Sequence, residues 1–375
     1  MTITFFTNQI NHHQIPLSDE FYKVLADDYR YVALERLPEE FIKNGYDDTL
    51  NRSYIIKAYE SENSLDKAKE LIDSSDVVII GHAPDCLFWE REKANKVTFH
   101  YSERWLKKGL LRALNPITLY HFYINHIRFR NKRTYMLCAS AFTASDVNLF
   151  GAYPHKCFKW GYFTKVPVEA PKPVIRDCTK IMWCARMIDW KHPELAVLLA
   201  KELKETGQSF ILDMYGSGYM KDSIQKVIDD YQLSDYVKLC GNVPNEEILS
   251  QMREHDIFLF TSDRGEGWGA VANEAMANGC VLVGSDEIGA VPYLVQDNVN
   301  GCIFKSEDLQ SLVSKISWLI ANPQERVRMA NAAYATMRDV WSPFFACERF
   351  LKLAKFALEN NLRDYNIKEG PASWA

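Results

Sequence analysis

The most constraining feature of the sequence is a regular alternation of short apolar runs with amphipathic segments of helical length. This pattern predicts parallel strands joined by helical crossovers. The chain has 375 residues, and one hydrophobic core rarely grows that large, so we expect two α/β domains. The predicted strands are 3–7, 77–81, 96–100, 134–139 and 157–160 in the first half, and 180–185, 209–215, 237–241, 257–261, 280–285 and 302–304 in the second.

A proline-rich segment separates the two halves. Residues 166–173 contain three prolines, so this stretch cannot be helical and is typical of a linker. After Ser342-Pro343, apolar residues recur at helical spacing. We therefore predict an N-terminal domain over 1–168, a C-terminal domain over 169–341, and a helix with a tail over 342–375.

Composition and cysteine usage exclude several classes of protein. With 47% hydrophobic and 25% charged residues, the chain is expected to be soluble and globular rather than disordered. The nine cysteines are odd in number and lack CxxC spacing, so neither a disulfide framework nor a zinc site is predicted. No signal peptide and no apolar stretch long enough to span a bilayer is found. A cytoplasmic location is therefore expected.

The densest group of candidate residues follows the predicted strand at 257–261. Glycines at alternate positions of 265–269 lie where this strand turns into a helix, at the sheet edge where open α/β sheets bind ligands. Glu266 precedes the helix and Glu274 lies inside it, so both carboxylates can face one crevice. A carboxylate accepts two hydrogen bonds, which suits the paired hydroxyls of a sugar or ribose. A glycine loop with two unrelated glutamates is the alternative, which the strand context disfavours.

A second loop combines two cations with a helix start. Arg186 and Lys191 follow the predicted strand at 180–185, and Pro193 marks the first turn of the next helix. Cations beside a helix N-terminus are what a diphosphate needs. Alone, the two residues would be interpreted as solvated surface charges, but the similarity to the glycine-rich loop favours binding.

A short glycine turn, Gly216-Ser217-Gly218, ends another predicted strand. It departs from the dinucleotide-binding fingerprint because Lys221 replaces the third glycine, so it is a weak signal by itself. We interpret it as a tight turn lining the nucleotide side of a cleft. Asn242 follows the next strand and could contact a base.

Together these motifs resemble family 4 of the retaining nucleotide-sugar glycosyltransferases, which have the GT-B fold. The resemblance rests on the Arg186/Lys191 pair, the glycine turn at 216–218, the seven residues between Glu266 and Glu274, and Gly289-Ala290-Val291-Pro292. It implies two Rossmann-like domains facing a central cleft, with a C-terminal helix crossing back to the first domain. The family commonly has Glu after this proline, whereas Tyr293 stands here.

The resemblance also implies roles for individual residues. Glu266 would bind the hydroxyls of the donor sugar, Glu274 would hold the ribose, and Arg186 with Lys191 would hold the diphosphate. His100, at the end of the strand at 96–100, resembles the family histidine that touches the transferred sugar.

The N-terminal half is expected to supply the acceptor side. Asn11, His12 and His13 follow the first strand, where the family often has a glycine pair. Two histidines at a strand end can bind metal, but no acidic or cysteine partner lies nearby in sequence, so polar contact with acceptor or phosphate is favoured. His82, at the end of another strand, is a further candidate.

Charge is distributed unevenly along the chain. The total is −5, but residues 104–160 carry ten basic and one acidic side chain. The segment 104–133 also contains interleaved apolar residues, which suits an anionic membrane surface; a solvated helix face is the alternative. Nucleic acid is not predicted, because the chain is acidic overall and no nucleic-acid motif occurs. The basic residues of this segment are Arg104, Lys107, Lys108, Arg112, Arg128, Arg130, Lys132 and Arg133.

We therefore predict a retaining glycosyltransferase that moves a sugar from a nucleotide-diphosphate sugar to an acceptor hydroxyl in polysaccharide or lipid-linked glycan synthesis. No Asp-x-Asp triplet occurs, so no metal and no cofactor is expected and cations must neutralise the leaving diphosphate. The alternatives are a GT-B epimerase or hydrolase of nucleotide sugars and a non-catalytic nucleotide-sugar-binding protein. The predicted catalytic residues are Glu266, His100, Lys191 and Arg186; the predicted donor-binding residues are Arg186, Lys191, Gly216, Ser217, Gly218, Asn242, Gly267, Trp268, Gly269 and Glu274; the acceptor residues are Asn11, His12, His13 and His82.

Overall fold

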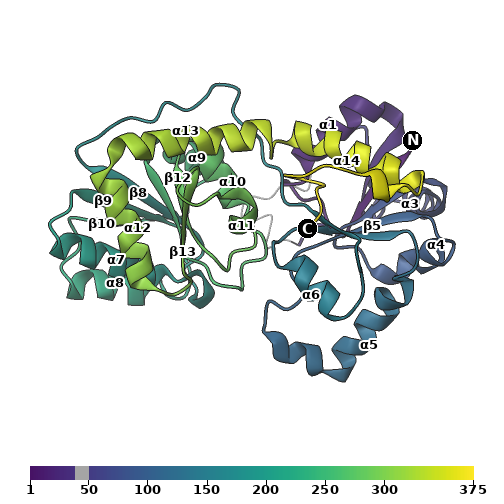
Figure 1. The fold of residues 1–375 in the computed structure, drawn as a ribbon, viewed down its shortest axis with the longest axis horizontal. Helices are drawn as coiled ribbons and strands as arrows, with labels where there is room; N and C mark the ends of the chain where they lie inside the picture. Colours follow the sequence, from purple (N-terminus) through teal and green to yellow (C-terminus); the bar gives the residue numbers. More distant parts are fainter. Residues whose placement is uncertain (39–49) are drawn as a thin grey trace. The chain divides into compact units, whose positions relative to one another are not determined.

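The computed structural model describes residues 1–38 and 50–375 and divides the chain into two compact units. The first unit comprises Met1–Thr164 together with Ser342–Ala375, and the second comprises Lys165–Trp341. Each unit contains one parallel β-sheet with helices packed against it (Figure 1). The predicted α/β class with two sheets is confirmed.

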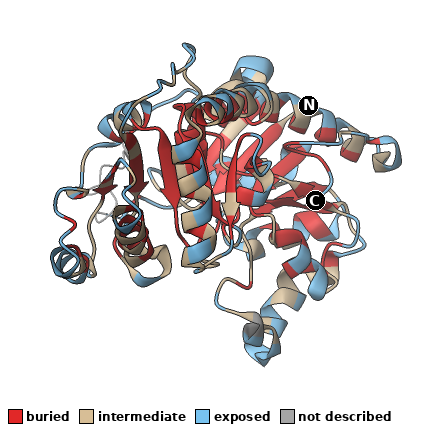
Figure 2. Cartoon of the chain, turned by 60° about the vertical axis from the view of Figure 1, so that its left-hand side comes forward, coloured by how far each residue is buried: buried red, intermediate tan, exposed pale blue. Residues whose placement is uncertain are grey.

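The first unit has a seven-stranded sheet in the order β3-β2-β1-β4-β5-β6-β7, in which every neighbouring pair is parallel. Its strands are buried while its helices expose one face (Figure 2). The strands are β1 (Ile3–Thr7), β2 (Tyr29–Ala33), β3 (Ile55–Lys57), β4 (Val77–Ile80), β5 (Val97–Ser102), β6 (Thr134–Cys138) and β7 (Cys157–Lys159). Its described α-helices are α1 (Ile15–Leu25), α3 (Glu62–Ser74), α4 (Trp89–Lys93), α5 (Pro116–Asn125), α6 (Thr143–Leu149) and α14 (Pro343–Leu358).

Two strands of this sheet, β2 and β3, are absent from the sequence-based prediction. In β2, Tyr29 and Tyr31 are fully buried, but Arg30 lies between them and two aspartates precede them, so no apolar run marks the strand. β3 has only three residues, too few to show a strand pattern. Hydrogen-bonded pairing of β2 with β1, and of β3 with β2, makes these segments strands, and not their composition.

The C-terminal helix α14 packs against α1 within the first unit, side by side with it in Figure 1. The ring of Phe350 lies 5.5 Å from that of Phe21 and 5.1 Å from that of Phe99. Aromatic contacts of this kind add to the free energy gained by burying the rings. The predicted return of the C-terminal helix to the N-terminal part of the chain is confirmed.

The second unit has a six-stranded parallel sheet in the order β10-β9-β8-β11-β12-β13. The sequence order reverses between β8 and β11, and in open α/β sheets ligands bind at such a point, beyond the carboxyl ends of the strands. The strands are β8 (Thr179–Cys184), β9 (Phe210–Tyr215), β10 (Val237–Gly241), β11 (Ile257–Phe260), β12 (Val281–Ser285) and β13 (Gly301–Phe304). Its helices are α7 (Pro193–Glu205), α8 (Lys221–Asp230), α9 (Asn245–Glu254), α10 (Val271–Ala277), α11 (Val291–Leu294), α12 (Leu309–Ala321) and α13 (Pro323–Asp339).

Candidate functional site

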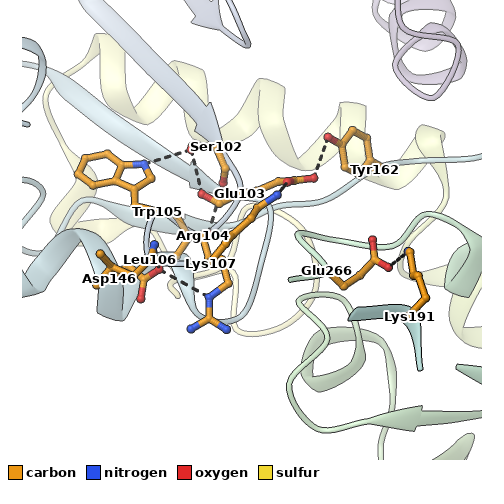
Figure 3. A network of polar contacts seen from close by, with 11 residues as sticks. Ser102, Glu103, Arg104, Trp105, Leu106, Lys107, Asp146, Tyr162, Lys191 and Glu266 are labelled. Atoms are coloured by element: carbon orange, nitrogen blue, oxygen red, sulfur yellow. Dashed lines mark hydrogen bonds and ion pairs between the residues drawn. The ribbon is translucent and has the colours of Figure 1, made fainter. Parts of the chain in front are cut away.

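Lys191 and Glu266 form an ion pair at the carboxyl edge of the second unit's sheet (Figure 3). Lys191 comes from the loop after β8, and Glu266 comes from the loop after β11. Both side chains are only 12% exposed. The hydroxyl of Ser262 donates to the Glu266 carboxylate at 3.1 Å, and the Lys191 ammonium lies 4.2 Å from the centre of the Trp190 ring. The two charged groups are therefore positioned by the protein itself.

Glu274 is the second predicted carboxylate of this edge, and it lies in α10. Burial raises the pKa of its carboxyl group to about 7, although a hydrogen bond with Asn245 acts in the opposite direction. Near neutral pH the group is therefore partly protonated, and ligand hydroxyls that donate to it would favour its ionised form. Arg186, in the loop after β8, is exposed and free to meet an anion from solvent.

The glycine turn at 216–218 packs directly against the loop that carries Arg186. A Cβ atom on Gly216, whose φ is +120°, would lie 1.9 Å from the carbonyl oxygen of Ala185. A Cβ atom on Gly218 would lie 2.2 Å from the carbonyl oxygen of Met187. The turn and the loop after β8 are therefore held together closely, and only glycine fits at these two positions.

The segment 267–269 has mainly a packing role. Gly269 has φ of +87°, and a Cβ atom there would lie 2.5 Å from the Phe260 ring. The Trp268 side chain is fully buried and its Nε1 donates to Asn273 at 2.8 Å. Its ring is therefore part of the core, so a donor contact of Trp268 would come from its backbone; Gly267 is buried beside it.

Tyr293, which stands where the family commonly has Glu, belongs to the same aromatic cluster. Its ring is 6.2 Å from the Trp268 ring and stacks on Trp341 with 6.0 Å between the ring centres. Tyr293 thus makes packing contacts that a Glu at this position would lack. Asn242 is exposed directly after β10, so its amide is accessible.

In the first unit, a cavity of about 330 Å³ lies at the carboxyl edge of the sheet. Asn11 and His82 line it, together with Tyr101, Glu103 and Tyr162. Tyr162 donates to the Glu103 carboxylate at 3.2 Å, as Figure 3 shows. This cavity brings together two of the four residues predicted for the acceptor side.

His12 and His13 do not line that cavity. Their rings lie 3.8 Å apart, and His12 is exposed whereas His13 is half-buried. Burial, with a smaller contribution from the charge of His12, lowers the pKa of His13 to about 3, so this imidazole is neutral at physiological pH. A neutral pair offers hydrogen bonds rather than positive charge.

His100 lies at the wall of a neighbouring cavity of about 340 Å³, which His82 also lines. Its ring is 3% exposed. Its Nε2 lies 2.8 Å from Glu92 Oε1, and its Nδ1 lies 3.4 Å from Asp85 Oδ1. Burial acts to lower the pKa of His100, but the two carboxylates raise it to about 10. Neither acid was singled out in the sequence, because a lone Asp or Glu in a helical turn carries no pattern.

The basic segment 104–133 is more internally paired than its sequence suggests. Lys107 forms an ion pair with Glu103, and the guanidinium of Arg128 lies 4.3 Å from the centre of the Trp89 ring. Arg133 donates to two carbonyl groups at the end of α14. Fewer free cations therefore face solvent than predicted.

The apolar residues of the same segment are, by contrast, strongly exposed. None of the residues of α5 is buried. No helix among residues 1–38 and 50–375 combines the length and the apolar composition that crossing a bilayer requires. The exposed apolar side chains are Leu111, Leu114, Ile117, Leu119, Tyr120 and Tyr123, between 40% and 82% accessible.

The part of the chain that carries these loops is similar in sequence to known glycosyltransferases. The sequence profile described as "Glycosyl transferases group 1" matches residues 171–336, which include every predicted donor-binding residue. The chain is 30% identical over 179 residues to the amylovoran biosynthesis glycosyltransferase AmsK of Erwinia amylovora, covering 46% of this chain and 44% of AmsK. It is 29% identical over 160 residues to the putative colanic acid biosynthesis glycosyltransferase WcaL of Escherichia coli K12, covering 41% and 38%. The matches thus span less than half of each relative.

Solved structures match over nearly the whole chain. Anabaena Alr3699/HepE in complex with UDP aligns with a TM-score of 0.70 and 13% identity, covering 95% of this chain and all of that one. A glycosyltransferase from Rickettsia africae aligns with a TM-score of 0.65 and 15% identity, covering 96% and 99%. At this identity the likeness concerns the fold alone, and it confirms the predicted GT-B fold.

Proposed function

We propose that this chain, whose residues 171–336 match the group 1 glycosyl transferases, belongs to that family and moves a sugar from a nucleotide-diphosphate donor to an acceptor hydroxyl. The observation that carries the proposal is the Lys191–Glu266 ion pair at the carboxyl edge of the second unit. Its two loops lie inside the matched segment, and its charges suit a diphosphate and sugar hydroxyls respectively.

The donor would bind to the second unit. Lys191 and Arg186 would neutralise the diphosphate as it leaves, without a metal ion there. Glu266, released from Lys191, would accept hydrogen bonds from the sugar, and Glu274 from the ribose. The resemblance to retaining enzymes supports a product with the anomeric configuration of the donor.

The acceptor would bind to the first unit, in the cavity lined by Asn11 and His82. His100 is paired with two carboxylates and almost fully buried, so we assign it to the wall of the neighbouring cavity of about 340 Å³ rather than to direct contact with the sugar. The names of AmsK and WcaL, glycosyltransferases of amylovoran and colanic acid biosynthesis, support a glycan or its lipid-linked precursor as acceptor. A cytoplasmic location is part of the same proposal.

Donor use is tested first. The full chain is screened by thermal shift against UDP, GDP, CDP and their sugars, and turnover of any stabilising donor is measured with and without a lipid-linked acceptor. We expect one nucleotide to raise the melting temperature and turnover to require the acceptor. Turnover without acceptor would favour a hydrolase, and no stabilisation by any nucleotide would contradict the proposal. Proton NMR of the product gives its anomeric configuration, and Mg²⁺ is expected to leave nucleotide affinity unchanged.

We further propose that the apolar surface of residues 111–123 touches a lipid bilayer. Contiguous exposed apolar side chains on a soluble domain commonly mark an interaction surface, and aromatic and aliphatic residues of this kind insert at the headgroup boundary. Lys108 and Arg130 are exposed nearby and would add attraction to anionic lipids.

Vesicle flotation tests this contact. We expect Ile117→Ser combined with Tyr120→Ser to reduce binding to anionic vesicles more than Lys108→Ala combined with Arg130→Ala. The reverse order would point to a purely electrostatic contact. Absence of binding by the unmodified chain would refute the proposal.

A further inference from the structure

Three potential metal ligands meet inside the first unit, apart from the residues assigned to the donor. Asp85 begins the turn Asp85–Phe88, His100 lies in β5, and His126 follows α5. One ligand atom of each lies within 4.8 Å of the other two. Asp85 Oδ1 is 3.4 Å from His100 Nδ1, and Asp85 Oδ2 is 4.0 Å from His126 Nε2. Ligand atoms about 2.1 Å from a tetrahedral metal ion are about 3.4 Å apart, so small side-chain shifts would suffice.

The remaining ring nitrogen of each histidine is already held by a partner. His100 Nε2 lies 2.8 Å from the carboxylate of Glu92, and His126 Nδ1 lies 2.8 Å from the hydroxyl of Tyr153. Metal-binding histidines commonly donate their second N–H in this way, which fixes the tautomer and aims the other nitrogen at the ion. Here the other nitrogen of each ring, His100 Nδ1 and His126 Nε2, is the one near Asp85.

The charge of the cluster also calls for a cation. Two acidic side chains lie beside these rings, the fully buried Glu92 and Asp85, whose side chain is 28% exposed. A buried carboxylate is unfavourable unless a positive charge compensates it. A divalent ion bound to Asp85 and His100 would supply such a charge beside both acidic side chains.

We propose that Asp85, His100 and His126 bind a divalent transition-metal ion. Two imidazoles and one carboxylate suit Zn²⁺, Co²⁺, Ni²⁺ or Fe²⁺ better than Mg²⁺ or Ca²⁺, which prefer oxygen ligands alone. The three residues line the cavity of about 340 Å³, so coordination positions remain open to water on that side. This site lies in the first unit and is independent of the diphosphate contacts proposed for the second.

The ion would also fix α5 to the sheet. α5 has no buried residue, and His126 is the residue at which it ends. Through His126 the ion would connect this helix to β5 and to the turn that carries Asp85. Bound metal should therefore slow amide hydrogen exchange in residues 116–129.

The test uses the full chain stripped of metal with a chelator. Zn²⁺ is titrated by calorimetry and Co²⁺ by its visible absorption. We expect one ion per chain and an affinity about 100-fold lower in Asp85→Asn and in His126→Ala. Glu92→Gln keeps all three ligands and should weaken binding roughly 10-fold, as outer-shell changes commonly do.

His121→Ala is the matched control, because it removes an exposed imidazole from the same helix. Its affinity should equal that of the unmodified chain, and hydrogen exchange in residues 116–129 should slow when Co²⁺ binds. The proposal is overturned if the unmodified chain takes up neither ion in stoichiometric amount. It is also overturned if His121→Ala weakens binding as much as His126→Ala, or if Glu92→Gln leaves the affinity unchanged.

Discussion

The two units use the same kind of sheet edge in different ways. In the second unit, the polar residues come from loops directly after β8 and β11, and one ion pair dominates. In the first unit, the polar cluster around His100 is assembled from a turn, a strand and a helix end, and its histidine and glutamate are almost completely buried. The comparison indicates that a ligand site on a loop leaves a sequence motif, whereas a site assembled from distant segments leaves none.

The largest expected effect concerns Glu266. Replacing it with Gln keeps the shape of the side chain but removes the charge that pairs with Lys191 and accepts from Ser262. We expect turnover to fall by about 10²–10³-fold, the usual cost of losing one preorganised charge contact. Steady-state transfer assays measure this, with Lys226→Ala on the exposed face of α8 as the control. Equal turnover rates for Glu266→Gln and the control would show that the Lys191–Glu266 ion pair does not contribute to transfer.

The second-largest expected effect is on the free energy of unfolding and concerns the glycine turn at 216–218. In Gly216→Ala the new Cβ atom would collide with the carbonyl oxygen of Ala185, and we expect a loss of about 3 kcal/mol. Gly207→Ala is the matched control, because Gly207 also has positive φ but nothing within 4 Å of its Cβ position. It should lose only about 1 kcal/mol. Denaturant unfolding followed by circular dichroism compares the stability of the two variants. Similar losses of stability would show that the close approach of Gly216 to the carbonyl oxygen of Ala185 does not require glycine.

The first unit should depend on a buried cation, Arg91, which donates to more carbonyl groups than Arg326, the buried arginine of the second unit. Arg91 is fully buried and donates to the carbonyl groups of Ile72, Ser75, Asp76 and Val97. Arg91→Lys cannot reach all four acceptors, so we expect a loss of about 2 kcal/mol. Glu92, which holds the His100 ring, is the next residue, so the Zn²⁺ affinity should fall together with the stability. Thermal unfolding and calorimetry report both changes, and an unchanged melting temperature would contradict the account of this region.

The smallest expected effect is a pH dependence in the second unit. The pKa of Glu274 is about 7 in the folded chain, so the ionised form that accepts ribose hydroxyls is the minor form below pH 7. Nucleotide binding should therefore weaken about tenfold between pH 8 and pH 6. The same shift means that ionising Glu274 destabilises the unliganded chain, so its stability should fall as pH rises from about 4.5 through 7. In Glu274→Gln, the pH dependence of nucleotide affinity and that of stability should both disappear. Nucleotide titrations and unfolding curves at three pH values measure them, and a pH dependence that persists in this variant would contradict the assignment to Glu274.

The sequence predicted the second unit better than the first for a physical reason. Its strands β11 and β12 are buried throughout and form continuous apolar runs, and its ligand loops need glycines at fixed places. Gly216 and Gly218 were recognised because the backbone of the loop after β8 comes so close to them that no residue with a Cβ atom fits. The burial of the Trp268 ring was not predicted, because an aromatic residue inside such a loop looks the same whether it faces a ligand or the core.

In the first unit, the strands β2 and β3 and the acids around His100 escaped prediction. Tyr29 and Tyr31 alternate with Arg30, and the carboxylates of Asp85 and Glu92 acquire their meaning only when β5 brings His100 beside them. Contacts between segments that are distant in sequence fix this site, and a single sequence does not contain that information.

Binding of a nucleoside diphosphate tests the central claim most directly. The nucleotide that stabilises the chain in the thermal screen is titrated by calorimetry into the unmodified protein, Lys191→Ala and Lys226→Ala. We predict one site per chain, an affinity at least about tenfold lower in Lys191→Ala because a charge-assisted contact is lost, and no change in Lys226→Ala. Equal affinities in all three proteins would contradict the assignment of the diphosphate to the Lys191 loop.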